Sequence, residues 1–290
     1  METVWITHES RKTIALQDPC VAALGFFDGV HLGHQAVIAE AKNIATKQKI
    51  KLSVLTFFPH PKEVLAHQKD AVRYLMPFAM KQKRLAELGV DVLYVIRFTP
   101  AFAALSPQQF VTEYLLALDV KHVVAGFDFT YGCRGEGSMR TIGEHGQGRF
   151  GVTTVGKVDQ GAEKISSTRI RDILAGGNVG SLPRYLGSFY ETRGRISPAC
   201  TMDPNIGPGT AIVSIDDCFT LPKPGVYETE AMIASRYHTC ISRIHCSDRP
   251  IVEIESDCIQ TVKQHAEICL RWIRHVGEET ALPSQMDLMQ

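Results

Sequence analysis

The chain has 290 residues, with 31 basic and 31 acidic side chains, so its formal net charge at neutral pH is zero. This balance gives no bulk charge that would favour binding to nucleic acid or to an anionic membrane, while a local phosphate site remains compatible with it. The first residues, METVWITHES, contain no apolar core of the kind found in signal peptides. No apolar run approaches the ~18 residues that cross a bilayer, and we therefore expect a cytoplasmic protein.

Eight cysteines are spread along the chain, six of them after residue 199, and none forms a CxxC pair. A zinc site of the common spacing is therefore disfavoured. A disulfide framework is disfavoured as well, because no export signal is recognised. We interpret the cysteines as reduced thiols.

The first half of the sequence alternates between apolar runs typical of buried strands and longer segments typical of helices. Such alternation predicts βαβ units, a parallel sheet, and helices on both faces of that sheet. We expect strands at 21–26, 52–57, 90–98 and 120–125, and helices at 34–48, 80–88, 107–118, 168–174 and 179–185. Ligands of such folds bind at the carboxyl ends of the strands, so motifs directly after strands are the informative ones.

After residue 189 the pattern changes to short strands separated by Pro and Gly, expected at 190–196, 210–215, 226–232, 238–244 and 250–254. This pattern predicts a small antiparallel barrel or sandwich. Residues 258–276 predict one amphipathic helix, because apolar side chains recur there near helical spacing (Ile259, Val262, Ala266, Cys269, Ile273 and Val276). The predicted fold class is α/β, with a Rossmann-like domain over 1–186 and a small β-barrel-like domain with a C-terminal helix over 187–290.

The first motif, GFFDGVHLGH at residues 25–34, follows the first predicted strand directly. Its HxGH core places His31 and His34 at the start of a helix, with both rings on one side. A helix N-terminus favours phosphate, and two imidazoles there can donate hydrogen bonds to ATP and to charge that develops in the transition state. Gly29 and Gly33 let the backbone approach a nucleotide closely. The alternative, a tight turn with two exposed histidines, is disfavoured by the complete string after an apolar strand.

Two aromatic motifs follow the second and fourth predicted strands. TFFPHP at residues 56–61 has two prolines that stiffen the loop, and its rings either stack on a flat ligand or belong to the core. GFDFTYG at residues 126–132 offers the Asp128 carboxylate to a ribose or a ring N–H, or forms a β-turn capped by that carboxylate.

The fourth motif, ISSTRIR at residues 165–171, opens a predicted helix. The hydroxyls of Ser166, Ser167 and Thr168 cap this helix in the simplest interpretation. Together with backbone N–H groups and Arg169 they also form a site for an anionic phosphate chain. Capping does not account for Arg169 and Arg171, and the phosphate site is therefore favoured.

Taken together, the four strings resemble the N-terminal domain of the prokaryotic riboflavin kinase/FAD synthetase family, a branch of the HxGH nucleotidyltransferase superfamily. The similarity covers roughly residues 15–186 in order and spacing. It implies an intact FMN adenylyltransferase domain that uses Mg²⁺, with ATP and FMN as substrates and FAD as product. It also implies ATP contacts at Gly25, His31, His34, Ser167, Thr168 and Arg169, and flavin contacts near Phe58, Pro59, His60, Asp128 and Phe129.

The candidate catalytic residues are therefore His31, His34 and Arg169. The candidate binding residues are Gly25, Phe26, Asp28, Gly29, Gly33, Phe58, Pro59, His60, Asp128, Phe129, Ser166, Ser167 and Thr168. One departure is visible: Ser138 follows Gly137 where the family often has an acidic residue. The residues that hold Mg²⁺ are not indicated.

The second half departs further from the family. The family's C-terminal riboflavin kinase barrel carries a Pro-Thr-Ala-Asn string that holds Mg²⁺ and ATP phosphates, whereas residues 194–207 here read GRISPACTMDPNIG. PGVY at 224–227 is similar to the family's next landmark, so we interpret the barrel as present but degenerate. A hydroxyl substrate needs a base and a well-defined metal site, and we therefore expect no kinase activity.

The favoured function is FAD synthesis from FMN and ATP without riboflavin kinase activity. The first rival is a bifunctional kinase and adenylyltransferase. Another HxGH enzyme, such as a cytidylyltransferase or a pantetheine-phosphate adenylyltransferase, is disfavoured by the FFPHP and GFDFTYG strings. A non-catalytic flavin-binding module is disfavoured by the two histidines and ISSTRIR. No nucleic-acid or membrane partner is expected, and the sequence does not indicate the oligomeric state.

Overall fold

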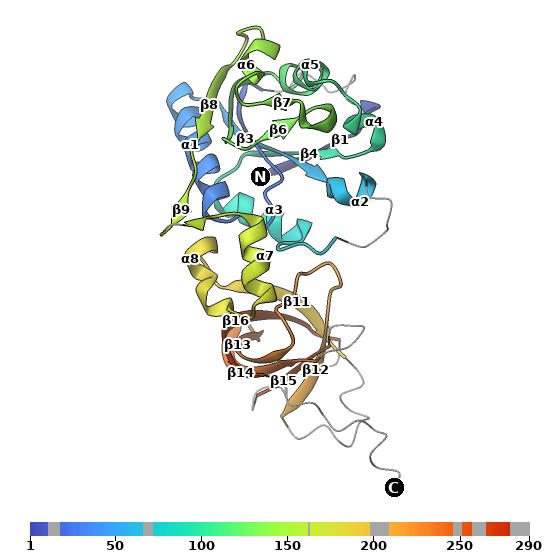
Figure 1. Ribbon diagram of the computed structural model, residues 1–290, viewed down its shortest axis with the longest axis vertical. Coiled ribbons are helices and arrows are strands. Elements are labelled where there is room, and N and C mark those ends of the chain that lie inside the picture. The colour runs from blue at the N-terminus through green and yellow to red at the C-terminus, as the bar shows by residue number, and fades with distance from the viewer. Residues whose placement is uncertain are drawn as a thin grey trace. The chain divides into compact units, whose positions relative to one another are not determined.

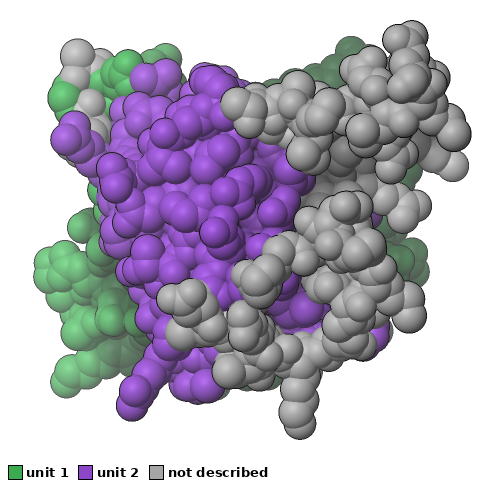
Figure 2. All heavy atoms as spheres, turned by 90° about the horizontal axis from the view of Figure 1, so that it is seen from below, with its two compact units in different colours: residues 1–167 green, residues 168–290 purple. Residues whose placement is uncertain are grey.

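The computed structural model describes residues 1–10, 18–65, 72–161, 163–197, 209–245, 251–256 and 265–278. The chain divides into two compact units, residues 1–167 and residues 168–290, which Figure 2 colours green and purple. Each unit is described by itself below.

Unit 1 is built on a six-stranded sheet in the order β1-β4-β3-β2-β5-β8, and every neighbouring pair is parallel. The strands are β1 (Glu2–Ile6), β2 (Cys20–Leu24), β3 (Lys51–Phe58), β4 (Val92–Arg97), β5 (Val120–Gly126) and β8 (Gly151–Val155). The four predicted strands are confirmed as β2 to β5, with ends that differ by one or two residues. The two edge strands β1 and β8 were not predicted.

Helices cover both faces of this sheet, as the alternation of elements predicted (Figure 1). One core cluster joins the sheet to α1 (Leu32–Gln48) and α3 (Phe78–Glu87). The other joins it to α4 (Pro100–Ala103), α5 (Pro107–Phe110), the π-helical segment η2 (Val111–Leu116) and α6 (Ile142–His145). The helix predicted at 107–118 is therefore present but changes type after Phe110.

The shorter elements of unit 1 connect these layers. They are α2 (Pro61–Leu65), β6 (Thr130–Tyr131), η3 (Cys133–Gly135), β7 (Gly137–Ser138), β9 (Asp159–Gln160) and β10 (Glu163–Lys164). The hairpin of β9 and β10 leads directly into the fourth motif.

Unit 2 begins with three short helical elements and continues into a barrel. The helical elements are α7 (Ser167–Ala175), η4 (Val179–Ser181) and α8 (Pro183–Leu186). The barrel is closed in the order β11-β12-β15-β14-β13-β16, which confirms the predicted small β domain. Its strands are β11 (Tyr190–Ile196), β12 (Thr210–Ile215), β13 (Gly225–Ile233), β14 (Arg236–Ile244), β15 (Ile251–Glu255) and β16 (Glu267–Gly277).

The predicted C-terminal helix at 258–276 is wrong over the residues that the structure describes. Residues Glu267–Gly277 form β16, which closes the barrel between β11 and β13. Ile268, Leu270 and Trp272 are buried in alternation, which is the period of a strand with one face in a core. Residues 257–264, where the helix was expected to begin, lie outside the described part of the chain.

Several side chains inside the barrel are hydrogen-bonded to each other in pairs. Trp272 Nε1 donates to Thr192 Oγ1 at 3.1 Å, and the hydroxyls of Thr229 and Ser242 lie 2.7 Å apart. Buried polar groups are tolerated when they are paired in this way. The closed core therefore keeps three buried hydroxyl side chains, each with a hydrogen-bond partner.

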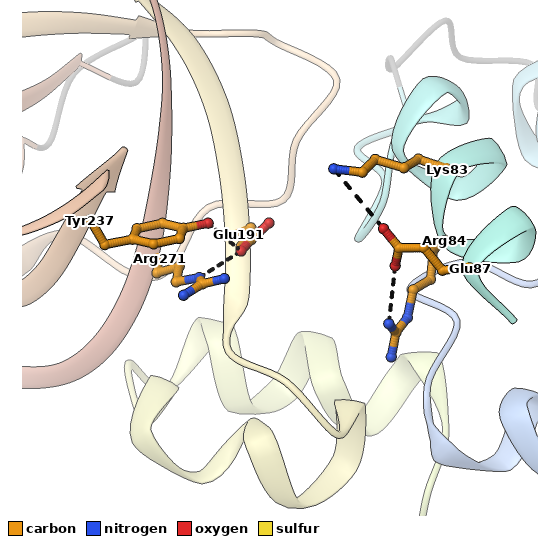
Figure 3. Close-up of polar contacts among 6 residues, drawn as sticks. All are labelled: Lys83, Arg84, Glu87, Glu191, Tyr237 and Arg271. Carbon is orange, nitrogen blue, oxygen red and sulfur yellow. Dashed lines mark hydrogen bonds and ion pairs between the residues drawn. The ribbon is translucent and has the colours of Figure 1, made fainter. Parts of the chain in front are cut away.

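Charged side chains on the barrel strands alternate with those buried residues and form an ion-pair cluster. Arg271 Nε donates to Glu191 at 2.7 Å, and its guanidinium lies 3.5 Å from the centre of the Tyr237 ring (Figure 3). In unit 1, Glu87 of α3 pairs with Arg84 at 3.2 Å and with Lys83 at 4.0 Å. Exposed pairs of this second kind contribute about 1 kcal/mol or less.

Candidate active site

His31 and His34 lie together at the start of α1, as the spacing predicted. The ring of His31 is the N-cap of the helix: its Nδ1 accepts a hydrogen bond from the backbone N–H of His34 at 3.2 Å. The two rings are stacked, with centroids 3.6 Å apart and an interplanar angle of 14°. Because Nδ1 of His31 accepts, the proton of the neutral ring lies on Nε2, which is left as a donor.

Burial keeps both histidines neutral. His31 is 6% exposed, and desolvation lowers the pKa of its ring to about 4. Desolvation also lowers the pKa of His34 well below its ordinary value, and the charge of Lys81 acts in the same direction. His34 Nδ1 is buried and has no hydrogen-bond partner among the described residues. The pair is therefore a set of neutral donors and acceptors at pH 7.

The loop before α1 has backbone conformations that few residues adopt. Gly29 has φ of 80°, whereas Phe27 and Val30 have φ of 54° and 39°. Positive φ is strained for a β-branched residue such as Val30 and is often found at functional sites. Gly33 has a different reason: a Cβ there would lie 3.2 Å from the His31 ring, so glycine lets that ring fold back onto the helix.

Asp28, a predicted nucleotide-binding residue, is 3% exposed and fixes the loop from within. Its Oδ1 accepts from the backbone N–H groups of Leu75 and Met76 at 3.0 and 3.1 Å. The Asp28 carbonyl accepts from the Ser167 hydroxyl at 3.0 Å, which joins the first motif to the fourth. The structure thus gives Asp28 a positioning role in the loop.

The first and second motifs meet through aromatic rings. Phe26 lies edge-on to the His60 ring, with centroids 4.5 Å apart, and stacks on Tyr74 at 6.2 Å. Phe58 packs against Phe78 and Trp5 at 5.4 and 6.0 Å. This aromatic wall stands where β3 ends, which is where a flat ligand was expected.

His60 is held in place within the second motif. Its ring Nδ1 accepts from the backbone N–H of Lys62 at 3.0 Å, and the backbone N–H of His60 donates to the Tyr74 hydroxyl at 3.0 Å. Tyr74 in turn donates to Glu63. Pro59, between Phe58 and His60, is half-buried at the same bend.

In the third motif the structure separates two predicted residues. The Asp128 carboxylate pairs with Lys164 of β10 at 2.5 Å, and Lys164 also lies 4.8 Å from the centre of the Phe127 ring. Phe129 instead packs against the core and stacks on Tyr131 at 6.1 Å. The Asp128 carboxylate slightly raises the pKa of His31 and the Lys164 ammonium slightly lowers it, both far less than burial does.

The fourth motif opens α7, as predicted. Ser167 is the first residue of that helix and the one that bonds to the loop of Asp28. Thr168 and Arg169 follow it on the first turn, and Ser166 immediately precedes the helix. Within unit 1, the predicted residues at 25–34, 58–60, 128 and 166–167 therefore gather around the carboxyl ends of β2, β3 and β5.

Two lysines near these motifs were missed by sequence reasoning. Lys164 pairs with Asp128, and Lys81 of α3 is 1% exposed beneath the first motif. A lysine in an amphipathic helix carries no sequence signal of burial, and only the tertiary structure reveals it. Among the described residues no group of three or more His, Cys, Asp or Glu side chains could hold a metal ion.

A parallel α/β sheet with an HxGH turn capping the helix after its central strand defines a nucleotide-binding enzyme of the nucleotidyltransferase type. The family model for FAD synthetase matches residues 13–169. A bifunctional riboflavin kinase/FMN adenylyltransferase of Listeria monocytogenes is 43% identical over 244 residues, which cover 84% of this chain and 78% of that protein. The chain therefore belongs to the FAD synthetase family.

Other relatives extend the similarity over the barrel. A bifunctional riboflavin kinase/FMN adenylyltransferase of Bacillus subtilis is 36% identical and covers 96% of this chain and 91% of its own length. A protein of Listeria monocytogenes named FAD synthetase is 30% identical over 74% of this chain and 82% of its own.

One solved structure has the same architecture from end to end. A crystal structure described as a macrolide-efflux protein from Streptococcus pneumoniae superposes with a TM-score of 0.86 at 27% identity, covering 99% of this chain and 95% of that one. In the described part of the present chain, no helix is long and apolar enough to cross a membrane.

Proposed function

We propose that this protein transfers AMP from ATP to FMN, giving FAD and pyrophosphate, and that it has no riboflavin kinase activity. The observation that carries the first part is the neutral, stacked pair of His31 and His34 at the start of α1. Family membership and the names of the relatives support it.

The chemistry needs no protein nucleophile. The second pKa of a phosphate monoester is ~6, so FMN arrives largely as a dianion. One of its phosphate oxygens attacks the α-phosphorus of ATP, and the bond from that phosphorus to the oxygen bridging to the β-phosphate breaks. Pyrophosphate leaves with the electron pair of that bond. The enzyme has to align the two phosphates and to stabilise the charge that builds up on the leaving group.

The predicted residues divide between the two substrates in this proposal. His31 donates from Nε2 to an ATP phosphate, and Arg169 binds two phosphate oxygens through its planar guanidinium. Gly25, His34, Ser167 and Thr168 complete the ATP site, with Phe26, Asp28, Gly29, Gly33 and Ser166 shaping the loops around it. Phe58, Pro59, His60, Asp128 and Phe129 contact FMN, and the aromatic wall at the end of β3 supports a stacking role for that group.

ATP would carry Mg²⁺ into this site in our proposal. Magnesium in nucleotide enzymes keeps several waters and is bound largely by substrate phosphates with one or two carboxylates. A site with no preformed carboxylate cluster among the described residues fits that mode of binding. When bound, the ion would neutralise charge on the triphosphate.

The proposed lack of kinase activity rests on sequence. Of the stretch at residues 194–207 that corresponds to the family's Pro-Thr-Ala-Asn region, residues 198–207 lie outside the described part of the chain. A second candidate, the bifunctional enzyme, is favoured by the names of the relatives that are 43% and 36% identical and by the closed barrel.

One assay separates these functions. The purified chain is incubated with ATP and Mg²⁺ and either FMN or riboflavin, and the flavins are separated by chromatography. FAD from FMN, with neither FMN nor FAD from riboflavin, is the expected result. FMN made from riboflavin would establish the bifunctional enzyme. No FAD from FMN would contradict the proposal as a whole. His31→Ala and His34→Ala are expected to lower the FAD-forming rate by ~10²-fold, as for loss of one transition-state donor.

A further inference from the structure

A buried lysine lies directly beneath the loop that leads to the two histidines. Lys81 of α3 is 1% exposed, and its Nζ donates to the carbonyl oxygen of Phe26 at 2.9 Å. The same ammonium lies 4.6 Å from the centre of the Phe26 ring. Lysine is almost never fully buried unless it is paired, because its charge loses hydration. The buried ammonium of Lys81 is therefore partnered by the loop, through the carbonyl and the ring of Phe26.

The Phe26 carbonyl has a second donor from another element. Thr56 of β3, also fully buried, donates from Oγ1 to this oxygen at 3.0 Å. One backbone carbonyl is thus held from α3 and from β3 at the same time. The residue that follows it, Phe27, is the first in the loop with positive φ.

The two hydrogen bonds to the Phe26 carbonyl hold a loop whose backbone is strained. A non-glycine residue in the left-handed region costs on the order of 1–3 kcal/mol and persists only when its surroundings hold it. Phe27 and Val30 both have such φ values within four residues. On the other side of the loop, the Asp28 carboxylate binds the backbone of Leu75 and Met76, in the segment that leads into α3. The loop is therefore held by hydrogen bonds from β3, from α3 and from the segment before α3, directly ahead of His31 at the start of α1.

The Lys81 ammonium interacts electrostatically with the Asp28 carboxylate and with the His34 ring. Burial lowers the pKa of Lys81 to about 8, while the Asp28 carboxylate opposes this shift. In the other direction, the charge of Lys81 contributes to the lowered pKa of His34 on α1. The lysine is therefore mostly charged at pH 7 and loses its charge just above that pH.

We propose that Lys81 is a positioning residue for adenylyl transfer: together with Thr56 it holds the Phe26 carbonyl and so sets the loop that places His31 and His34. This role rests on the proposed FMN adenylyltransferase activity. Lys81 acts through the loop and not by contact with a substrate. A misplacement of ~1 Å in such a loop costs about 10²-fold in rate.

The test compares Lys81→Met with Lys83→Met in the full chain. Both substitutions remove an ammonium from α3, but the Lys83 side chain is 70% exposed and pairs with Glu87 at 4.0 Å on the surface (Figure 3). Steady-state FAD formation from FMN is measured between pH 6.5 and 9.5, with a urea unfolding curve for each variant. Removing one partner of a buried polar contact can destabilise the fold, so the unfolding curves are needed to separate a loss of activity from a loss of stability.

We expect Lys81→Met to lower kcat by ~10²-fold with little change in KM, and Lys83→Met to match the wild type. In the wild type kcat should fall as pH rises through about 8, and this limb should be absent from Lys81→Met. Thr56→Val removes the other donor to the same carbonyl and should lower kcat by ~10-fold, which keeps the proposal testable if Lys81→Met does not fold.

The outcomes distinguish this role from the function on which it rests. Wild type and Lys83→Met that form no FAD would contradict the adenylyltransferase and this role together. Active wild type with kcat of Lys81→Met and Thr56→Val within twofold of it would remove the role of Lys81 alone. A KM increase without a change in kcat would also count against positioning, because it would indicate uniform loss of substrate binding.

Discussion

At the scale of single residues, burial determines how the histidine pair can act. A neutral imidazole at a helix N-terminus both accepts and donates, whereas an imidazolium only donates and is repelled by the helix dipole. His31 uses its Nδ1 to cap α1 and keeps Nε2 for a ligand. The low pKa values are therefore part of how the site is built.

The first prediction concerns the stability that neutral His31 confers. The unfolded chain protonates this residue below pH ~6.5, whereas the folded state resists protonation until about pH 4. The unfolded state binds more protons in that window, so the free energy of unfolding falls as pH decreases through it. A shift of this size predicts a loss of about 2 kcal/mol between pH 7 and pH 5 from His31 alone.

His31→Asn tests this prediction because Asn also caps helices and does not titrate. Urea unfolding at pH 7 and pH 5 should show a smaller loss of stability on acidification for the variant than for the wild type. Equal losses in the two proteins would mean that His31 is not protonated differently in the folded and unfolded states.

Arg169 gives a second prediction at this scale. A guanidinium binds two phosphate oxygens in a fixed plane, whereas an ammonium is a point charge. Arg169→Lys should therefore retain FAD formation at a rate ~10-fold lower, and Arg169→Ala should lose ~10²-fold or more. Wild-type rates in Arg169→Ala would leave this arginine without a role in the reaction.

The residues that could be predicted from sequence are those with local signals. The spacing of His31 and His34 after an apolar run was enough to place both rings at a helix start. The neutrality of these rings, the use of the Asp28 carboxylate inside the loop and the burial of Lys81 depend on segments 40 or more positions away. Such long-range contacts leave no trace in local spacing.

At the scale of elements, the spacing of apolar residues along the chain decided which predictions of strands and helices succeeded. Strands β2 to β5 are mainly apolar because both faces of the sheet are covered, and they were recognised. The helix at 258–276 was wrong because Cys269, Ile273 and Val276 suit a helical period as well as Ile268, Leu270 and Trp272 suit a strand. Closure of the barrel, a long-range requirement, selects the strand.

A third prediction tests this assignment of β16. Leu270 is fully buried in the strand, whereas Val276, a core position in a helix, is 44% exposed. Leu270→Ala should lower the free energy of unfolding by about 2–5 kcal/mol, and Val276→Ala should change it by about 0.5 kcal/mol or less. Urea unfolding curves of the two variants measure both values. The reverse order of the two losses would contradict the strand.

At the scale of the whole molecule, three of the four motifs lie entirely in unit 1, whereas the fourth is divided between the two units. Residues 25–34, 56–61 and 126–132 belong to unit 1, whereas Thr168 and Arg169 lie in unit 2 on α7. Within unit 2, α7 is attached to the barrel: the Leu174 carbonyl accepts from the Lys223 backbone N–H at 3.0 Å. The barrel therefore supports a helix that carries two of the predicted ATP-binding residues, even if it has no reaction of its own.

The last prediction follows from that attachment. The two tryptophans report on separate units, since Trp272 is fully buried in the barrel and Trp5 is 48% exposed in unit 1. In Leu270→Ala the red shift of Trp272 emission should occur roughly 10 °C lower than in the wild type. FAD formation should be lost at the same lowered temperature, because α7 loses its support when the barrel unfolds. Val276→Ala, the control, should lose activity at the same temperature as the wild type. If Leu270→Ala stayed active above its barrel transition, α7 would keep its active conformation without the barrel, and the support inferred from the Lys223–Leu174 hydrogen bond would be contradicted.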